Sequence, residues 1–183
     1  MRALTWQARS ITGALLAAGS LILIAAGSVA ATPGAQIAGC AGGAWHAVQF
    51  NSSNELVQNA AESITGGDLF LAVLDNGQFE MLWNDLTVTR TIGRVSANIA
   101  IDGSSSGTLT EIAPGLVSGV TDRTVMRTTI SVAGQPPVER MVDVSTRDDG
   151  PPATYECIDG RLETTVSIPG GGVVRLVFER LVG

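Results

Sequence analysis

Acid–base or metal chemistry in this chain would centre on His46, its one histidine. A catalytic or haem-binding histidine must point into a pocket, and a zinc site of the usual kind needs further histidine or cysteine ligands. The sequence has no second histidine, and its two cysteines are better explained as a disulfide pair. We therefore interpret His46 as an ordinary strand residue and predict neither a metal site nor a cofactor.

A serine nucleophile is the second chemistry to consider, because Ser104, Ser105 and Ser106 follow Asp102 closely. Such a nucleophile needs an oriented base, and the elbow of many hydrolases has the pattern Gly-x-Ser-x-Gly. The histidine is distant in the sequence, and no elbow surrounds these serines. The run is typical of a polar turn, so we predict no catalytic residue and no enzyme activity.

Charged residues form two further groups. The first could bind calcium, but its spacing matches no established calcium loop and is typical of solvated acidic loops. It consists of Asp148, Asp149, Glu156 and Asp159. The second lies on adjacent predicted strands, where cross-strand ion pairing explains it as well as an acid–base group does. It consists of Arg127, Glu139, Arg140 and Asp143.

Residues 1–30 have the pattern of a signal peptide. Arg2 and Arg9 precede an apolar run over 11–26, and small residues follow at 27–31. This pattern predicts cleavage after Ala30 or one residue later, and the positive-inside preference places the downstream chain outside the membrane. The apolar run is also long enough to span a membrane, so an uncleaved anchor with the same orientation is an alternative.

Lipid attachment is another alternative, because Ile37-Ala38-Gly39-Cys40 resembles the lipobox of bacterial lipoproteins. The mature chain would then be anchored through an acylated Cys40, and Cys157 would be an unpaired thiol. The even number of cysteines in an exported chain favours a disulfide between Cys40 and Cys157 instead. Chain-entropy models give such a bridge roughly 4–5 kcal/mol as an upper figure. The predicted location is therefore secreted or extracytoplasmic, with the lipoprotein as the alternative.

The composition limits the partners of the chain. Its 183 residues include no lysine, and its abundant Ala and Gly suggest a GC-rich bacterial genome. Without Arg2 and Arg9, nine arginines face 17 acidic residues, which gives a net charge of −8. That charge repels phosphate backbones and anionic lipid surfaces. We expect a monomer with no nucleic-acid partner and with membrane contact only through the signal or a lipid anchor at Cys40.

One domain follows the signal. Residues 31–42 are small and turn-rich, which is typical of a flexible lead-in, and the first strand is predicted over 44–50. A short helix is predicted next, over about 53–65. Ser52 and Glu55 have the spacing of a capping box, apolar residues recur at helical spacing as far as Ile64, and the glycines at 66 and 67 end the helix.

After residue 67 the apolar residues alternate with period two. Asp75-Asn76-Gly77 predicts a hairpin turn, and Asp102-Gly103 predicts another between strands over 94–101 and 107–112. About nine or ten short strands separated by such turns are typical of an all-β fold. We predict an antiparallel up-and-down barrel of about 8–10 strands over 43–183, because closing the sheet removes exposed edges.

Several short motifs resemble the lipocalins and related calycin barrels, in particular small exported bacterial members. They are Gly43-Ala44-Trp45 at the first strand, Tyr155-Glu156-Cys157, Gly160-Arg161-Leu162, and Phe178-Glu179-Arg180 at the last strand. The resemblance implies that Trp45 plugs the closed end of the barrel and that Arg180 lies across its ring. Such a cation–π contact is worth about 1–2 kcal/mol when partly buried.

These observations predict an exported, non-enzymatic β-barrel that binds a small apolar ligand or serves as an envelope accessory protein. The candidate cavity residues are large and apolar: Phe70, Phe79, Met81, Trp83, Met126, Ile130 and Met141. Such residues are more typical of a plain core, since an eight-stranded barrel can be filled by its own side chains. A packed interior would favour the alternative, a secreted protein-interaction module or inhibitor that uses its outer sheet or the loop over 148–152.

Overall fold

The computed structural model describes residues 40–54, 60–145, 148–168 and 172–181. The predicted signal peptide and nearly all of the predicted lead-in lie outside these residues. Ten strands occupy the described part: β1 (Gly43–Asn54), β2 (Ala60–Val73), β3 (Gln78–Ile92), β4 (Val95–Ala113), β5 (Leu116–Val132), β6 (Val138–Val144), β7 (Asp148–Asp149), β8 (Ala153–Ile158), β9 (Arg161–Ile168) and β10 (Gly172–Arg180). Within these ranges no helix has the length and apolarity needed to cross a membrane.

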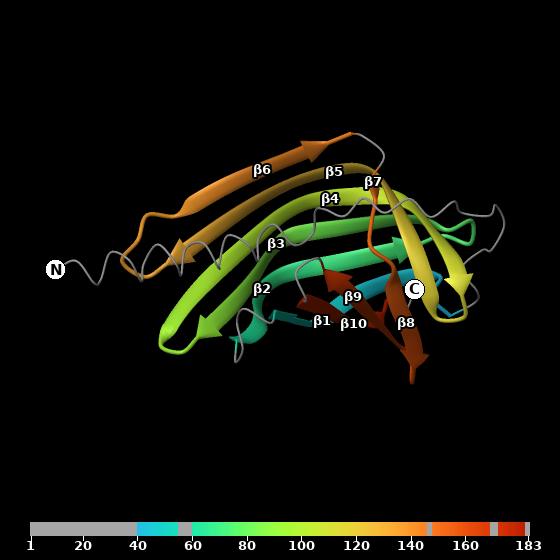
Figure 1. The fold of residues 1–183 in the computed structure, drawn as a ribbon, viewed down its shortest axis with the longest axis horizontal. Helices are drawn as coiled ribbons and strands as arrows, with labels where there is room; N and C mark the ends of the chain where they lie inside the picture. The colour runs from blue at the N-terminus through green and yellow to red at the C-terminus, as the bar shows by residue number, and fades with distance from the viewer. Residues whose placement is uncertain (1–39, 55–59, 146–147, 169–171, 182–183) are drawn as a thin grey trace.

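Eight of these strands close into an antiparallel barrel, in the order β1-β2-β3-β4-β5-β8-β9-β10 with β10 paired to β1. The strands β3 to β6 lie side by side in a long curved sheet, and β8, β9, β10 and β1 lie below it (Figure 1). β5 is shared, because its first residues pair with β8 and its later residues pair with β6. The predicted antiparallel barrel is confirmed.

Period-two alternation explains why these segments form strands. In β4, Ala97, Ile99 and Ile101 are buried, whereas Ser96 and Asn98 are exposed and Ala100 is half-buried. The same alternation in the other strands places one face of the sheet in a common core. The most deeply buried apolar side chains of this core are Trp45, Leu69, Leu86, Val88, Met126, Leu162 and Phe178.

The predicted helix over about 53–65 is wrong. From Ala60 onward the chain belongs to β2, which pairs with β3 from Ala60 opposite Ile92 to Val73 opposite Phe79; residues 55–59 lie outside the described part. The hydroxyl of Ser52 donates to the carboxylate of Glu62 at 2.8 Å and is not a helix cap. A helix of three turns needs a partner surface, and here the strand ladder to β3 decided the conformation instead.

The predicted turn at Asp75-Asn76-Gly77 is present, with Gly77 donating to Leu74 at 2.8 Å. The predicted turn at Asp102-Gly103 is not, because β4 continues through both residues. Gly103 has a positive φ of 141°, and a Cβ there would lie 2.1 Å from the carbonyl oxygen of Val125. The absence of a side chain at Gly103 therefore allows β5 to approach β4 closely. In the sequence alone, a glycine needed for such an approach cannot be distinguished from one that forms a turn.

We predict that Gly67→Ala destabilises the barrel far more than Gly93→Ala. Both glycines have positive φ, 66° and 62°, but a Cβ at Gly67 would lie 2.1 Å from the carbonyl oxygen of Asp85, whereas nothing lies within 4 Å of one at Gly93. Denaturation in urea should give a loss of about 1 kcal/mol for Gly93→Ala and at least roughly 2–3 kcal/mol for Gly67→Ala. Equal losses would contradict the predicted clash.

Candidate functional site

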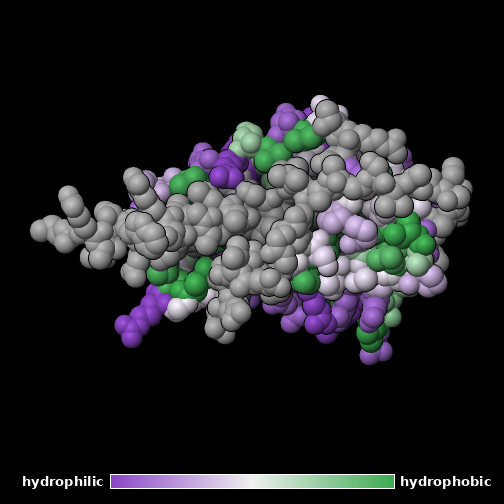
Figure 2. Space-filling model, viewed as in Figure 1, coloured by the Kyte–Doolittle hydropathy of each residue, from purple (hydrophilic) through white to green (hydrophobic). Residues whose placement is uncertain are grey.

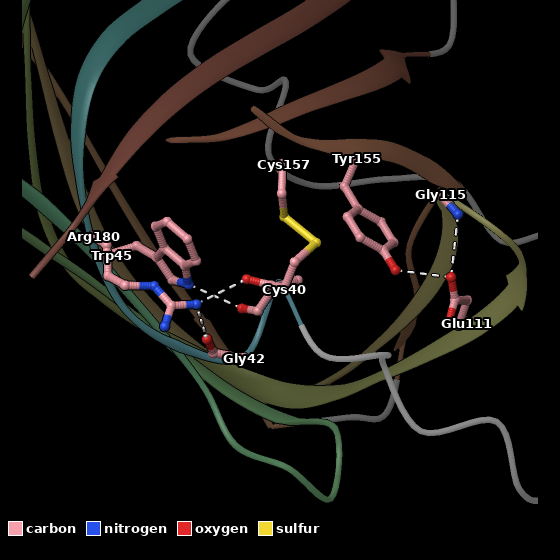
Figure 3. Close-up of a disulfide and its surroundings, with 9 residues drawn as sticks. Cys40, Gly42, Trp45, Glu111, Gly115, Tyr155, Cys157 and Arg180 are labelled. Atoms are coloured by element: carbon pink, nitrogen blue, oxygen red, sulfur yellow. Dashed lines mark hydrogen bonds between the residues drawn. A yellow bond between two sulfur atoms is a disulfide. The ribbon is translucent and has the colours of Figure 1, made fainter. Parts of the chain in front are cut away.

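One end of the barrel is stabilised by a disulfide between Cys40 and Cys157, whose Cα atoms lie 6.2 Å apart. Figure 3 shows the bridge between the chain that precedes β1 and the strand β8. The predicted pairing of the two cysteines is therefore confirmed, and the chain has no free cysteine in this structure. The bridge fastens the start of the barrel to a strand 117 residues later in the sequence.

Trp45 and Arg180 lie beside this bridge as a cross-strand pair of β1 and β10. The indole of Trp45 is fully buried and donates to the carbonyl oxygen of Ala41 at 2.9 Å. The guanidinium of Arg180 lies 4.7 Å from the centre of the tryptophan ring (Figure 3). It also donates to the carbonyl oxygens of Cys40 and Gly42 at 3.0 and 2.9 Å. Arg180 thus connects the end of β10 to the chain that leads into β1.

The seam between β5 and β8 is short, with Leu116 opposite Thr154 and Val117 opposite Ala153. Tyr155 extends it, because its hydroxyl donates to the carboxylate of Glu111 at 2.8 Å and its amide donates to the carbonyl oxygen of Gly115 at 2.8 Å. The same carboxylate accepts from the amide of Gly115 at 3.1 Å (Figure 3). Burial, together with the hydrogen bond to Glu111 and its negative charge, raises the pKa of Tyr155 to about 12.

A polar group lies inside the barrel near its other end. The side chains of Arg90 in β3 and Glu62 in β2 are only 1% and 3% exposed, and Nε of Arg90 lies 3.1 Å from Oε1 of Glu62. Both oxygens of Glu62 also accept hydrogen bonds from Ser52 in β1, from the amide at 2.7 Å and from the hydroxyl at 2.8 Å. The carboxylate is therefore held in place from two sides.

Arg90 is less well satisfied than Glu62. Its Nε and Nη1 atoms are buried and have no hydrogen-bond partner among the described residues, since the close approach of Nε to Glu62 lacks hydrogen-bond geometry. Buried donors are almost always paired in folded proteins, so two on one side chain require an explanation. A bound water or the oxygen of a ligand would supply the missing acceptor.

Apolar side chains on the same face of the sheet surround this group. Val88 precedes Arg90 by two residues in β3, Ala97 lies opposite Arg90 in β4, and Ile99 follows on the same face. At the opposite end of the two strands, β1 and β2 pair over Gly43–His46. Beyond that pairing, the described residues of the two strands are joined by the bonds between Ser52 and Glu62. The polar group thus lies where two barrel strands separate, at the end of an apolar wall.

Five of the seven predicted cavity residues belong to the core or pack against it: Phe79, Met81, Trp83, Met126 and Ile130. The other two lie elsewhere. Phe70 alternates with buried Leu69 and Leu71 and contacts the ring of His46 with the centroids 5.2 Å apart. Met141 is 65% exposed in β6. Neither Phe70 nor Met141 is placed to line the interior.

The residues considered for other chemistry are also separated. His46 lies on the outer side with partial exposure, where its Nε2 is 2.9 Å from Oδ1 of Asp68. Ser105 is buried in the middle of β4 and shares a hydrogen bond of 3.0 Å with Thr124. In the described part of the chain, no three histidine, cysteine or acidic residues lie close enough to hold a metal ion.

An open cleft of about 300 Å³ lies among the described residues of the outer surface. Its lining combines apolar side chains with two exposed carboxylates: Ala72, Leu74, Gln78, Phe79, Glu80, Ser106, Gly107 and Asp122. It lies beside the hairpin of β2 and β3, where β5 has a bulge opposite Gly107. Elsewhere on the visible face, hydrophobic residues form small separate groups among hydrophilic ones (Figure 2).

Comparison with known protein families, with curated proteins and with solved structures finds no match to this chain. The function must therefore be argued from the arrangement of its own residues.

The interior group of Ser52, Glu62 and Arg90 was missed from the sequence. A signal for part of it exists, because Leu86, Val88 and Arg90 alternate with Thr87 and Thr89, which places Arg90 on the apolar face of a strand. Glu62 falls within the predicted helix, so nothing in the sequence placed it beside Arg90. Only the pairing of β2 with β3 brings it opposite Arg90.

We predict that Arg180→Ala lowers the free energy of unfolding by about 2 kcal/mol, because it removes a cation–π contact and two hydrogen bonds. Arg175→Ala on the same strand is the control, since Arg175 only forms an exposed ion pair with Glu163. Such pairs are worth less than about 1 kcal/mol. Chemical denaturation of both variants tests this, and equal small losses would show that the contacts of Arg180 do not stabilise the barrel.

Tyr155 allows a direct pH test, because it is the only tyrosine of the chain. Tyrosinate absorbance of the folded protein should rise with a midpoint near pH 12, whereas the unfolded chain should titrate near pH 10. Between these values the unfolded state loses the proton and the folded state keeps it, so stability falls as the pH rises through this window. Tyr155→Phe should abolish that fall. A folded-state midpoint near 10 would contradict the role of Glu111.

Proposed function

We propose that this chain is an exported, non-enzymatic β-barrel that binds a small, largely apolar ligand inside the barrel. The observation that carries the proposal is the buried guanidinium of Arg90, which has two nitrogens without partners beside an apolar wall. A group that served stability alone would be expected to have its donors satisfied. A binding site of this kind needs just such a combination, an apolar lining with a few fixed polar groups.

The disulfide supports the exported part of the proposal. An intramolecular bridge between Cys40 and Cys157 suggests an oxidising environment outside the cytoplasm. The apolar segment that precedes it in the sequence agrees with this location. A secreted chain and a membrane-anchored chain would both present the same barrel to the outside.

A protein-interaction role is the second candidate, and β6 is the observation that favours it. Among the described strands, β6 pairs along one edge with β5 and ends the sheet order. Its Val138 and Met141 are exposed on the surface. An edge strand with exposed apolar residues can add a strand from a partner. Its charged residues Glu139 and Asp143 are also the kind that discourage such pairing.

Binding of a neutral apolar dye, N-phenyl-1-naphthylamine, tests the first function. The exported protein should bind the dye saturably, with increased fluorescence. Ala97→Leu enlarges an inward-facing residue beside Arg90 and should weaken binding at least about tenfold, whereas Ser96→Leu enlarges the outward-facing neighbour and should not. The added methylenes strain a packed core by about 1–3 kcal/mol, so the melting temperature of each variant is measured too. Absence of saturable binding to the wild type would refute ligand binding.

A further inference from the structure

The charges inside the barrel restrict the kind of ligand that the interior can accept, and this inference rests on the proposed function. We infer that the ligand is an uncharged amphipathic molecule whose carbonyl, ester or hydroxyl oxygen accepts hydrogen bonds from Arg90. A carboxylate or phosphate head group is disfavoured at the same place.

The positive charge of Arg90 is already balanced. An arginine stays protonated in proteins, and the carboxylate of Glu62 lies 3.1 Å from its Nε with almost no exposure to water. Glu62 is committed to this position, because both of its oxygens accept hydrogen bonds from Ser52. The pair is therefore electrically neutral, and a second anion would leave a net negative charge in an apolar interior. Such a charge is costly to bury.

Hydrogen bonding, by contrast, is incomplete. The Nε and Nη1 atoms of Arg90 offer N–H groups without acceptors, whereas Glu62 accepts on both oxygens. A neutral oxygen can accept from Arg90 without changing the charge of the site. The rest of such a ligand would lie along the apolar side chains of the same face, which are Val88, Ala97, Ile99 and Ile130.

The pair of Glu62 and Arg90 lies beside the place where β1 and β2 separate. Among the described residues, the backbone pairing of the two strands extends over Gly43–His46, and the bonds of Ser52 to Glu62 lie where the strands have diverged. The same carboxylate therefore balances Arg90 and joins the two strands at the gap.

Three probes of equal chain length test the inference by displacement of the bound dye: decane, 2-decanone and decanoate. The wild type should bind 2-decanone at least about tenfold more tightly than decanoate, because the carboxylate adds an uncompensated charge. Its preference for 2-decanone over decane should exceed that of the double variant Arg90→Met/Glu62→Leu by about threefold to tenfold, the value of one hydrogen bond. The double variant is neutral and apolar, so it controls for the water solubility of the probes.

Glu62→Gln provides the sharpest comparison, because the amide keeps the shape but leaves the charge of Arg90 uncompensated. This variant should reverse the order and bind decanoate more tightly than 2-decanone. The Nε–Hε signal of Arg90 in an NMR spectrum of the wild type should shift on addition of 2-decanone, and this measurement remains decisive if Glu62→Gln does not fold.

The outcomes separate the two proposals. If decane and 2-decanone bind but the double variant keeps the same preference, or if the Arg90 signal does not move, a buried water satisfies Arg90 and the inference is wrong while ligand binding stands. Tighter binding of decanoate than of 2-decanone by the wild type would also overturn it. If neither the dye nor any of the three probes binds, the proposed function itself fails.

Discussion

Closure of the sheet between β5 and β8 is the constraint on which the rest of this barrel depends. The ladder there is short, so its residues Leu116 and Val117 need support from outside the strand pairing. Tyr155 and Glu111 provide it with hydrogen bonds that cross the seam, and the disulfide at Cys157 fastens the same strand to the start of β1. Without closure, the alternating apolar residues of all eight strands would lose the common interior that buries them.

Because the Glu62 and Arg90 pair is buried in the interior of the barrel, its incomplete hydrogen bonding requires an explanation. In water, an ion pair with two unused donors would be unremarkable, because solvent would satisfy them. Inside a barrel the low dielectric strengthens each charge interaction and makes each missing hydrogen bond costly. The two ends of the barrel therefore differ in how fully their polar side chains are hydrogen-bonded. At the end that holds the disulfide, Nε1 of Trp45 and Nη2 of Arg180 have backbone carbonyl acceptors, whereas Nε and Nη1 of Arg90 have none among the described residues.

The two proposed functions depend on different parts of the same architecture. Ligand binding uses the inner face of β2, β3 and β4 around Arg90, whereas a protein partner would use β6, which lies outside the closed ring. This separation allows each function to be tested by variants that leave the other face unchanged.

The sequence by itself determined the strand-rich class, the pairing of the only two cysteines, and the hairpin at Asp75-Asn76-Gly77, because each depends on residue type and short spacing. Tertiary structure decided the conformation after Ser52, the uninterrupted course of β4 through Gly103, and the meeting of Glu62 with Arg90. A short apolar pattern can fit both an amphipathic helix and a strand. The free-energy difference between the two conformations then comes from pairing with a strand that is distant in the sequence. For the same reason, only the register of β2 against β3 could show that two opposite charges lie buried inside an apolar barrel.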